Sequence, residues 1–339
     1  MTSSMTIPKT MHALTQPDPK STELLLTTVP TPTPTPNTPQ HLVRVEACAP
    51  CSGELLWPAN FPPATPRILI PCPDFAGTVV SAPPDSPFPP GTKVYTRANY
   101  IRNGAASEYT ISITEELSNC PRGLSWAECA AIPLSAMTAW QALFVHAGIG
   151  GLECGRWKGK RVLVTGAAGG VGAWVVQLAK LAGASVIGTC GAHNLEFVRG
   201  LGADEVLDYR TMDIKAWASA GHCEAKVDVV IDCIGQKALS DAWWAVKDGG
   251  AVLSIFQPPG QVRPEGCEVN DVADTFFIME PNGKHLEAIT RLIEEGKCRG
   301  FVDSVWPLER FREAFGRVDT GHARGKVVID FSLNRSRFD

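Results

Sequence analysis

The chain has 339 residues, of which 44% are hydrophobic and 19% are charged, and its formal net charge is −4. This length favours two domains over one, and the composition is that of an ordinary globular protein. The slight negative charge, without any basic run, argues against nucleic acid or a membrane surface as a partner. No apolar stretch approaches the roughly 18–20 residues that span a bilayer. The 11 cysteines show no regular spacing, so we expect reduced thiols and a cytoplasmic location.

The first part of the chain has the pattern of short strands separated by proline-rich turns. Proline at every second position over 30–36 favours an extended loop, with a motif for a proline-binding partner as the alternative. Ser125 and Glu128 have capping-box spacing, which predicts a helix over 125–131, and helical character continues over 135–146. Strands are predicted at 24–29, 42–47, 75–80, 93–95 and 106–113.

After residue 161, short apolar strands alternate with helical patterns, which implies parallel strands joined by right-handed crossovers. The predicted strands are 161–165, 185–189, 205–207, 227–231 and 251–256, and the predicted helices are 171–181, 194–201 and 236–246. Two helices (284–295 and 308–318) and a strand (326–331) follow, and we expect them to return to the first domain. The prediction is an α/β protein with a mostly antiparallel β-domain (1–133 and 270–339) and a doubly wound parallel domain (134–269).

A glycine-rich turn joins the strand at 161–165 to the next helix. Glycines let backbone N–H groups approach the pyrophosphate of a dinucleotide, and the N-terminus of the helix faces the same phosphates. A tight turn without a ligand is the alternative, but the strand–turn–helix context within a series of βα units favours a cofactor. The residues expected to bind it here are Gly166, Ala168, Gly169, Gly170, Val171 and Gly172.

The end of the next strand bears on the choice between NADH and NADPH. An NAD site usually has an acid there, which bonds the ribose hydroxyls. Here Thr189, His193 and Asn194 mark the strand end, and no acid occurs between them. A carboxylate would repel a 2′-phosphate, so its absence favours NADPH, with Arg199 and Arg210 as further positive charge nearby. We expect Thr189, His193 and Asn194 to lie beside the cofactor.

Residues 166–180 (GAAGGVGAWVVQLAK) closely resemble the signature of quinone oxidoreductases in the medium-chain dehydrogenase/reductase (MDR) superfamily. Residues 73–77 (PDFAG) are similar to the family's G-x-D-x-A-G, with Pro73 in place of the glycine. Further likenesses, in the family's order, are found at 103–109 (NGAASEY), 130–140 (AAIPLSAMTAW) and 321–328 (GHARGKVV).

The resemblance implies a GroES-like catalytic domain formed from both chain ends, a Rossmann domain between them and an active site in the cleft. It also implies a homodimer and hydride transfer from NADPH to an activated double bond or a quinone. Thr138 matches a threonine near the nicotinamide, and Tyr209 matches a tyrosine near the 2′-phosphate. Alternatively, the Thr138 hydroxyl is hydrogen-bonded within its own helix, and Tyr209 is a surface aromatic residue. Phe256 and Lys326 complete the expected cofactor contacts.

The zinc ligands of the superfamily's alcohol dehydrogenases are missing. Catalytic zinc there is held by Cys, His and Cys. Cys51 falls at the first position, but Pro73-Asp74 stands where the histidine is expected, and 133–136 supplies no cysteine. The four-cysteine structural zinc lobe is also missing. We therefore predict no metal. Without a Lewis acid, reduction of a conjugated carbonyl is favoured over alcohol oxidation, because an enolate needs only hydrogen-bond donors and a proton.

The proton donor is the least determined part of the mechanism. In many relatives an asparagine stands at the position of Cys51 and a tyrosine at that of Leu56. The candidate catalytic residues are Cys51, Glu54, Tyr100 and Thr138. Cys51 could instead be a buried thiol, Glu54 a structural acid and Tyr100 a surface residue. Solvent is an alternative proton donor.

Five aromatic residues are expected to line the cleft, although each also suits a core position: Trp57, Phe61, Phe256, Phe276 and Phe277. A bulky apolar lining would imply an apolar or conjugated-carbonyl substrate. The leading hypothesis is an NADPH-dependent double-bond or quinone reductase. The alternatives are a stand-alone enoyl reductase of a polyketide-type assembly, a nucleotide-binding protein without turnover, and a redox-neutral enzyme.

Overall fold

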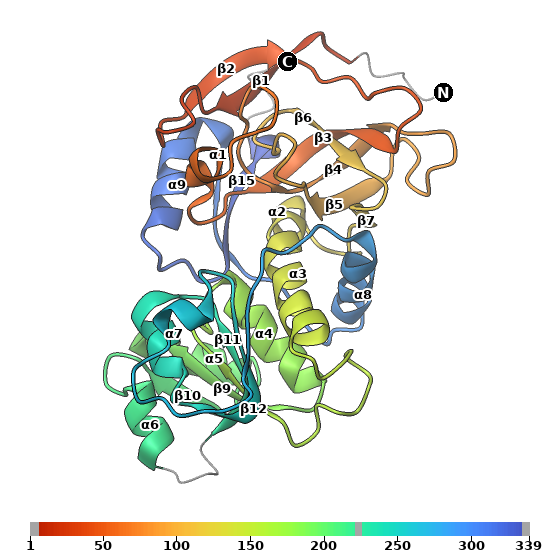
Figure 1. Ribbon diagram of the computed structural model, residues 1–339. Helices are drawn as coiled ribbons and strands as arrows, with labels where there is room; N and C mark the ends of the chain where they lie inside the picture. Colours follow the sequence, from red (N-terminus) through yellow and green to blue (C-terminus); the bar gives the residue numbers. More distant parts are fainter. Residues whose placement is uncertain (1–6, 221–225, 334–339) are drawn as a thin grey trace. The chain divides into compact units, whose positions relative to one another are not determined.

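The computed structural model describes residues 7–220 and 226–333, which form two compact units (Figure 1). The first unit contains the described residues up to Leu134, Glu280–Glu294 and the described residues from Gly300 onward; the second contains Ser135–Met279 and Glu295–Arg299. The predicted boundary at 269 assigns 270–279 to the first domain, whereas the structure places them in the second unit. The reason is that strand β13 (Ala273–Phe276) pairs in parallel with β12 (Val246–Ser254).

The first unit is built on antiparallel strands. They are β1 (Thr10–Thr15), β2 (Leu25–Pro30), β3 (Gln40–Ala49), β4 (Asp74–Ser81), β5 (Lys93–Arg97), β6 (Tyr109–Ile113), β7 (Ser118–Asn119), β14 (Val302–Trp306) and β15 (Lys326–Asp330). β1 pairs with β2, and the remaining strands form a sheet of order β14-β15-β3-β4-β5-β7, with β6 on β3. Only β14 and β15 are parallel among the strand pairs described in this unit. β15 therefore brings the C-terminal part of the chain next to β3.

Four helices accompany these strands: α1 (Trp57–Asn60), α2 (Trp126–Ala130), α8 (Gly283–Glu294) and α9 (Phe311–Asp319). The capping box predicted for α2 is confirmed: the Ser125 N–H donates to the Glu128 carboxylate over 2.8 Å, and the Glu128 N–H donates to Ser125 Oγ over 3.3 Å. α8 is tied to β5, because the Tyr95 hydroxyl lies 2.8 Å from Thr290 Oγ1. An apolar core of this unit is formed by side chains from β1–β5, β15 and α9, among other residues.

The second unit is a six-stranded parallel sheet of order β10-β9-β8-β11-β12-β13. Its further elements are β8 (Arg161–Val164), β9 (Ser185–Cys190), β10 (Glu205–Asp208), β11 (Val227–Asp232), α4 (Gly170–Leu181), α5 (Leu195–Gly200), α6 (Ile214–Ala220) and α7 (Gln236–Ala242). Figure 1 shows α4–α7 around these strands. The helix predicted over 236–246 ends earlier, because Val246 already pairs with Val227 in the sheet. This order confirms the predicted doubly wound, Rossmann-type sheet, in which ligands bind at the carboxyl ends of the strands.

One helical stretch contradicts the expectation that no apolar segment approaches membrane-spanning length. Trp126–His146 is 21 residues long with a mean hydropathy of 1.2, and it contains α2, α3 (Pro133–Gln141) and a π-helical turn (Ala142–His146). The sequence pattern predicts two shorter helices here, over 125–131 and 135–146. The combined length of the helical stretch therefore could not be recognised from the sequence. Within the protein 72% of the apolar window is buried. A buried core helix therefore accounts for its composition.

Asp232, at the carboxyl end of β11, fastens three strands of the second unit together. Its side chain is completely buried. It accepts hydrogen bonds from the hydroxyl of Thr165 after β8 (2.7 Å), from that of Ser254 at the end of β12 (2.8 Å) and from the N–H of Gly235 (2.9 Å). A buried carboxylate is tolerated when it is saturated with donors in this way. The loops at this edge of the sheet are thereby held in place.

We predict that Asp232→Ala lowers the free energy of unfolding by about 3–5 kcal/mol, because three buried donors lose their acceptor at once. Urea denaturation followed by circular dichroism measures the change. Glu265→Ala, at an exposed acid of the same unit, is the control and should stay within about 0.5 kcal/mol of the wild type. A loss for Asp232→Ala as small as that of the control would contradict the prediction.

Candidate functional site

The glycine turn between β8 and α4 has the geometry that a pyrophosphate requires. Gly166 has φ of +65°, and a Cβ on Gly172 would lie 2.3 Å from the Gly166 carbonyl oxygen. Glycine is therefore required at both positions. α4 begins at Gly170, and its N-cap, Gly169, offers no side chain to occupy the first N–H groups. These groups are open to a ligand, as a phosphate site at a helix N-terminus needs.

Thr189 supports this turn from β9. Its backbone carbonyl accepts from the Ala167 N–H over 2.8 Å, and its hydroxyl accepts from the Gly166 N–H over 3.3 Å. Ala168 is buried, whereas Val171 is partly exposed. Thr189 thus holds the start of the glycine turn in place through its hydrogen bonds to Gly166 and Ala167.

The end of β9 is bordered by the aromatic ring of Tyr209. A Cβ on Gly191 would lie 3.7 Å from the Tyr209 hydroxyl oxygen. Tyr209 is 54% exposed, and the guanidinium carbon of Arg210 lies 5.8 Å from its ring centroid. His193 is exposed and Asn194 partly exposed in the turn that follows β9. The structure thus brings together a tyrosine, an arginine and a histidine around the strand end.

An acid that the sequence reasoning missed lies beside this strand end. Asp208, the last residue of β10, stands opposite Cys190 in the parallel register. Its Oδ1 accepts from the Arg210 N–H over 3.0 Å and so closes its own turn. Only the pairing of β9 with β10 reveals this neighbour, since the two residues are far apart in the sequence.

Phe256 and Thr138 occupy different settings within the second unit. Phe256 follows β12 and is 55% exposed; its ring covers Gly235, where an added Cβ would lie 2.1 Å from a ring carbon. Thr138 is buried in α3. Two other residues of this unit were expected to line the cleft. Phe276 is exposed at the sheet edge, but Phe277 is buried, with its ring centroid 4.4 Å from that of His146. Phe277 therefore takes the core position that was its alternative.

In the first unit, Glu54 is a buried acid with one uncommitted oxygen. It lies in a short 3-10 turn, Glu54–Leu56, and is 5% exposed. Oε1 accepts from the Cys72 N–H over 3.1 Å, whereas Oε2 has no hydrogen-bond partner among the described residues. Burial raises the pKa of Glu54 to about 8, against the opposing charge of Lys326. At neutral pH the carboxyl group is therefore mostly protonated, and it can donate a hydrogen bond.

Lys326 and Asp74 form a buried ion pair close to this acid. The Lys326 Nζ donates to the Pro50 carbonyl over 2.7 Å and lies 3.1 Å from Asp74 Oδ2. Asp74 Oδ1 accepts from the Leu134 N–H over 2.7 Å. Burial would lower the pKa of Lys326, but the nearby acidic groups, Asp74 first among them, raise it above its usual value. Lys326, predicted to bind the cofactor, thus has its ammonium committed to Asp74 and Pro50.

These residues do not suit catalytic zinc. Cys51 is a soft ligand of the kind that zinc prefers, but neither a histidine nor a second cysteine stands at the two other expected ligand positions. Asp74, which stands in the expected histidine motif, is neutralised by Lys326. In the described part of the chain, no group of three or more His, Cys, Asp or Glu side chains is arranged to hold a metal ion. We derive no step through a metal.

A hollow in the first unit opens beside Glu54. Trp57 and Phe61 form one side, and Tyr100 lies on the other with its ring centroid 6.2 Å from that of Phe61. Tyr100 is 43% exposed. The structure thus brings Glu54 and Tyr100, two of the predicted catalytic residues, to one hollow with two of the predicted aromatic residues. Arg67 and Arg102 also line it. No sequence pattern indicated these two residues, because both lie in irregular loops.

Comparison with known proteins agrees with this architecture. Residues 201–329 match the family model described as "Zinc-binding dehydrogenase". A solved structure, that of the quinone oxidoreductase from Coxiella burnetii, superposes with a TM-score of 0.76 at 26% sequence identity, covering 95% of this chain and 99% of that one.

Two relatives extend the agreement to the sequence. The "Probable zinc-binding oxidoreductase, mitochondrial" of Arthroderma benhamiae is 49% identical over 97% of this chain and 99% of its own length. The "Chloroplast envelope quinone oxidoreductase homolog" of Arabidopsis thaliana is 34% identical over 80% of this chain and 81% of its own length. The chain is thus an oxidoreductase, and it belongs to the medium-chain dehydrogenase/reductase superfamily as a quinone oxidoreductase-like protein.

Proposed function

We propose that the chain is an NADPH-dependent reductase that transfers hydride to an activated C=C bond or a quinone without zinc. The observation that carries this proposal is the buried Glu54 in the lining of an aromatic hollow, with the Lys326–Asp74 ion pair where a zinc site would need free ligands. Burial raises the pKa of Glu54 to about 8, which favours its protonated form at neutral pH. An acid and hydrogen-bond donors are sufficient for the enolate or hydroquinone that such a reduction forms. Its cytoplasmic location stays a prediction, since the two relatives above are named as mitochondrial and chloroplast proteins.

The cofactor assignment rests on the second unit. Members of this superfamily typically bind NAD(P)H, which supplies the hydride. The glycine turn leaves space and open N–H groups for the pyrophosphate. At the end of β9, Tyr209, Arg210 and His193 offer a ring, a positive charge and an imidazole to a 2′-phosphate, while the acid of an NAD site is missing from the strand itself. These features favour NADPH over NADH.

In this mechanism Glu54 supplies the proton. Reduction of a conjugated carbonyl requires one hydride at the β-carbon and one proton on the resulting enolate. Glu54 lines the hollow, and its Oε2 is buried and has no hydrogen-bond partner among the described residues. The ammonium of Lys326 stabilises the carboxylate that remains after the proton leaves. Solvent then returns the proton to Glu54 before the next turnover.

We predict NADPH oxidation, followed at 340 nm, with at least one class in a panel of quinones, enones and enoyl thioesters. The purified protein should contain no stoichiometric zinc by elemental analysis, and a chelator should leave the rate unchanged. Tight NADPH binding without turnover on the whole panel would overturn the reductase proposal. One zinc per chain together with loss of activity on chelation would overturn its zinc independence.

We predict that Glu54→Gln lowers kcat by about 100-fold, because the amide cannot supply the proton. In the wild type, activity should fall as the pH rises through about 8, where Glu54 loses its proton. The variant should lack this alkaline limb. Glu23→Gln, at an exposed acid of the same unit, should change neither the rate nor the pH profile. An unaltered kcat and alkaline limb in Glu54→Gln would assign the proton to solvent.

For the cofactor, we predict that Gly191→Asp weakens the affinity for NADPH relative to NADH by at least about tenfold, since its carboxylate would repel the 2′-phosphate. Gly191 has φ of −81° and ψ of 158°, which any residue adopts. Gly191→Ala is the matched control for bulk and should preserve the preference. Dissociation constants from fluorescence titration test both variants; an equal loss for the two cofactors in Gly191→Asp would contradict the assignment.

A further inference from the structure

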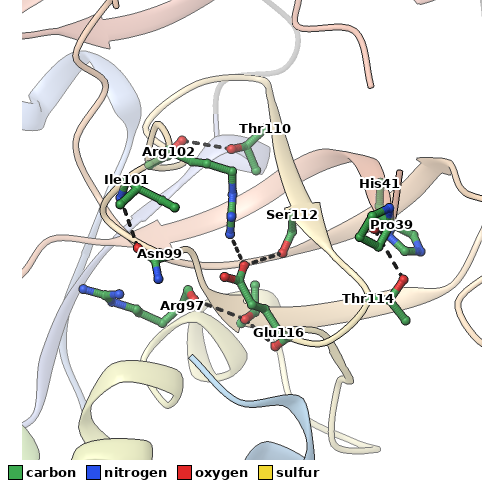
Figure 2. A network of polar contacts seen from close by, with 12 residues as sticks. Pro39, His41, Arg97, Asn99, Ile101, Arg102, Thr110, Ser112, Thr114 and Glu116 are labelled. Carbon is green, nitrogen blue, oxygen red and sulfur yellow. Dashed lines mark hydrogen bonds and ion pairs between the residues drawn. The ribbon is translucent and has the colours of Figure 1, made fainter. Parts of the chain in front are cut away.

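Two arginines line the hollow, and each has a buried donor without an acceptor. Arg67 donates to the Tyr100 carbonyl over 2.7 Å and to the Ile101 carbonyl. Arg102 forms an ion pair with Glu116 (Figure 2). The Nε atoms of Arg67 and Arg102 are both buried and have no hydrogen-bond partner within the described residues. A buried N–H without an acceptor is costly, and both guanidinium groups therefore have donors that the described residues do not use.

The charges around the hollow leave an excess of positive charge. Glu116 neutralises Arg102 and is itself held by the Ser112 hydroxyl at 3.4 Å, as Figure 2 shows. Arg67 has no ion-pair partner among the described residues, and burial together with the charge of Arg102 lowers its pKa. Glu54 adds little negative charge at neutral pH, because burial raises its pKa to about 8. One guanidinium charge is therefore uncompensated.

The rest of the lining is apolar and aromatic. Trp57, Phe61 and Tyr100 border the space next to the arginines, together with prolines and aliphatic side chains. Gln16 also lines it, but its Nε2 is occupied by the carbonyls of Ser21 and Leu55, each at 2.7 Å. A ligand that fits this hollow has a planar apolar body and one anionic group.

We propose that the hollow binds the carboxylate of the substrate, so that the preferred substrate is an enone or quinone that carries a carboxylate group. The guanidinium groups of Arg67 and Arg102 take the carboxylate, and the aromatic rings pack on the conjugated body. This inference rests on the proposed reductase function and names its substrate class.

The first test compares a 4-oxo-5-alkenoic acid with its methyl ester. Two methylene groups separate the carboxyl group from the enone, so the two compounds differ in charge but not in the reactivity of the C=C bond. We expect kcat/KM with NADPH to be at least about tenfold higher for the acid, since a charge-assisted hydrogen bond is lost in the ester. The preference should shrink as the salt concentration rises. Equal kcat/KM for acid and ester, or a preference for the ester, would overturn the proposal.

The second test separates recognition by Arg67 from its hold on the Tyr100 segment. In Arg67→Gln, kcat/KM for the acid should fall at least about tenfold, while that for the ester should change by less than about threefold. Equal losses for both compounds would show that Arg67 only supports the loop, and would overturn the proposal. Arg122→Gln, at an exposed arginine paired with Glu294 in the same unit, is the control and should alter neither value.

A binding measurement distinguishes failure of this inference from failure of the reductase function. The probes are the saturated 4-oxoalkanoic acid, which cannot accept hydride at a C=C bond, and its methyl ester. By calorimetry we expect the acid to bind at least about tenfold more tightly than the ester, and Arg67→Gln to abolish the difference. This result without any turnover would support the anion site and reject the reductase. Turnover of enones with no such difference in affinity would reject the anion site alone.

Discussion

A buried ammonium group is the constraint on which the first unit depends. Lys326 lies near the C-terminus, and it contacts Pro50 and Asp74 from the N-terminal part of the chain. Two buried charges are costly to desolvate, and each has one further polar contact here: the Pro50 carbonyl accepts from Lys326, and the Leu134 N–H donates to Asp74. Asp74 in turn fixes the Leu134 N–H at the start of α3. The Lys326–Asp74 pair therefore connects β15 to β4, and Asp74 connects β4 to the first turn of α3.

The same pair determines the chemistry beside it. A positive charge that is permanently present near Glu54 limits how far burial can raise the pKa of that acid, so that it reaches about 8. An acid in this range is protonated at neutral pH and still gives up its proton readily. The ammonium of Lys326 supplies the local positive charge in the proposed zinc-independent reaction. A reaction that needs a proton, rather than a Lewis acid, is the one that this arrangement suits.

Local sequence patterns revealed most strands and helices of the second unit, but neither its edge strand β13 nor the hollow of the first unit. The glycine turn, the strands around it and the capping box at Ser125 are encoded by residues close together in the chain, so periodicity and spacing reveal them. Strand β13 was missed because its residues show no clear alternation and their pairing with β12 is a long-range contact. Asp208 was missed for the same reason, since only the register with β9 places it beside Cys190. Arg67 and Arg102 lie in loops, where no periodicity indicates which way a side chain points.

Glu54 and the arginines border the same hollow, so the proton and the proposed carboxylate affect each other. A bound carboxylate places a negative charge near Glu54, which disfavours ionisation and raises the pKa of that acid further. By linkage, a protonated Glu54 binds the anion more tightly than an ionised one does, and by the same factor. The arginines oppose this effect, because their positive charge favours the ionised acid. Binding of an anionic substrate thus offsets that positive charge, and it keeps the proton on Glu54 until the enolate requires it.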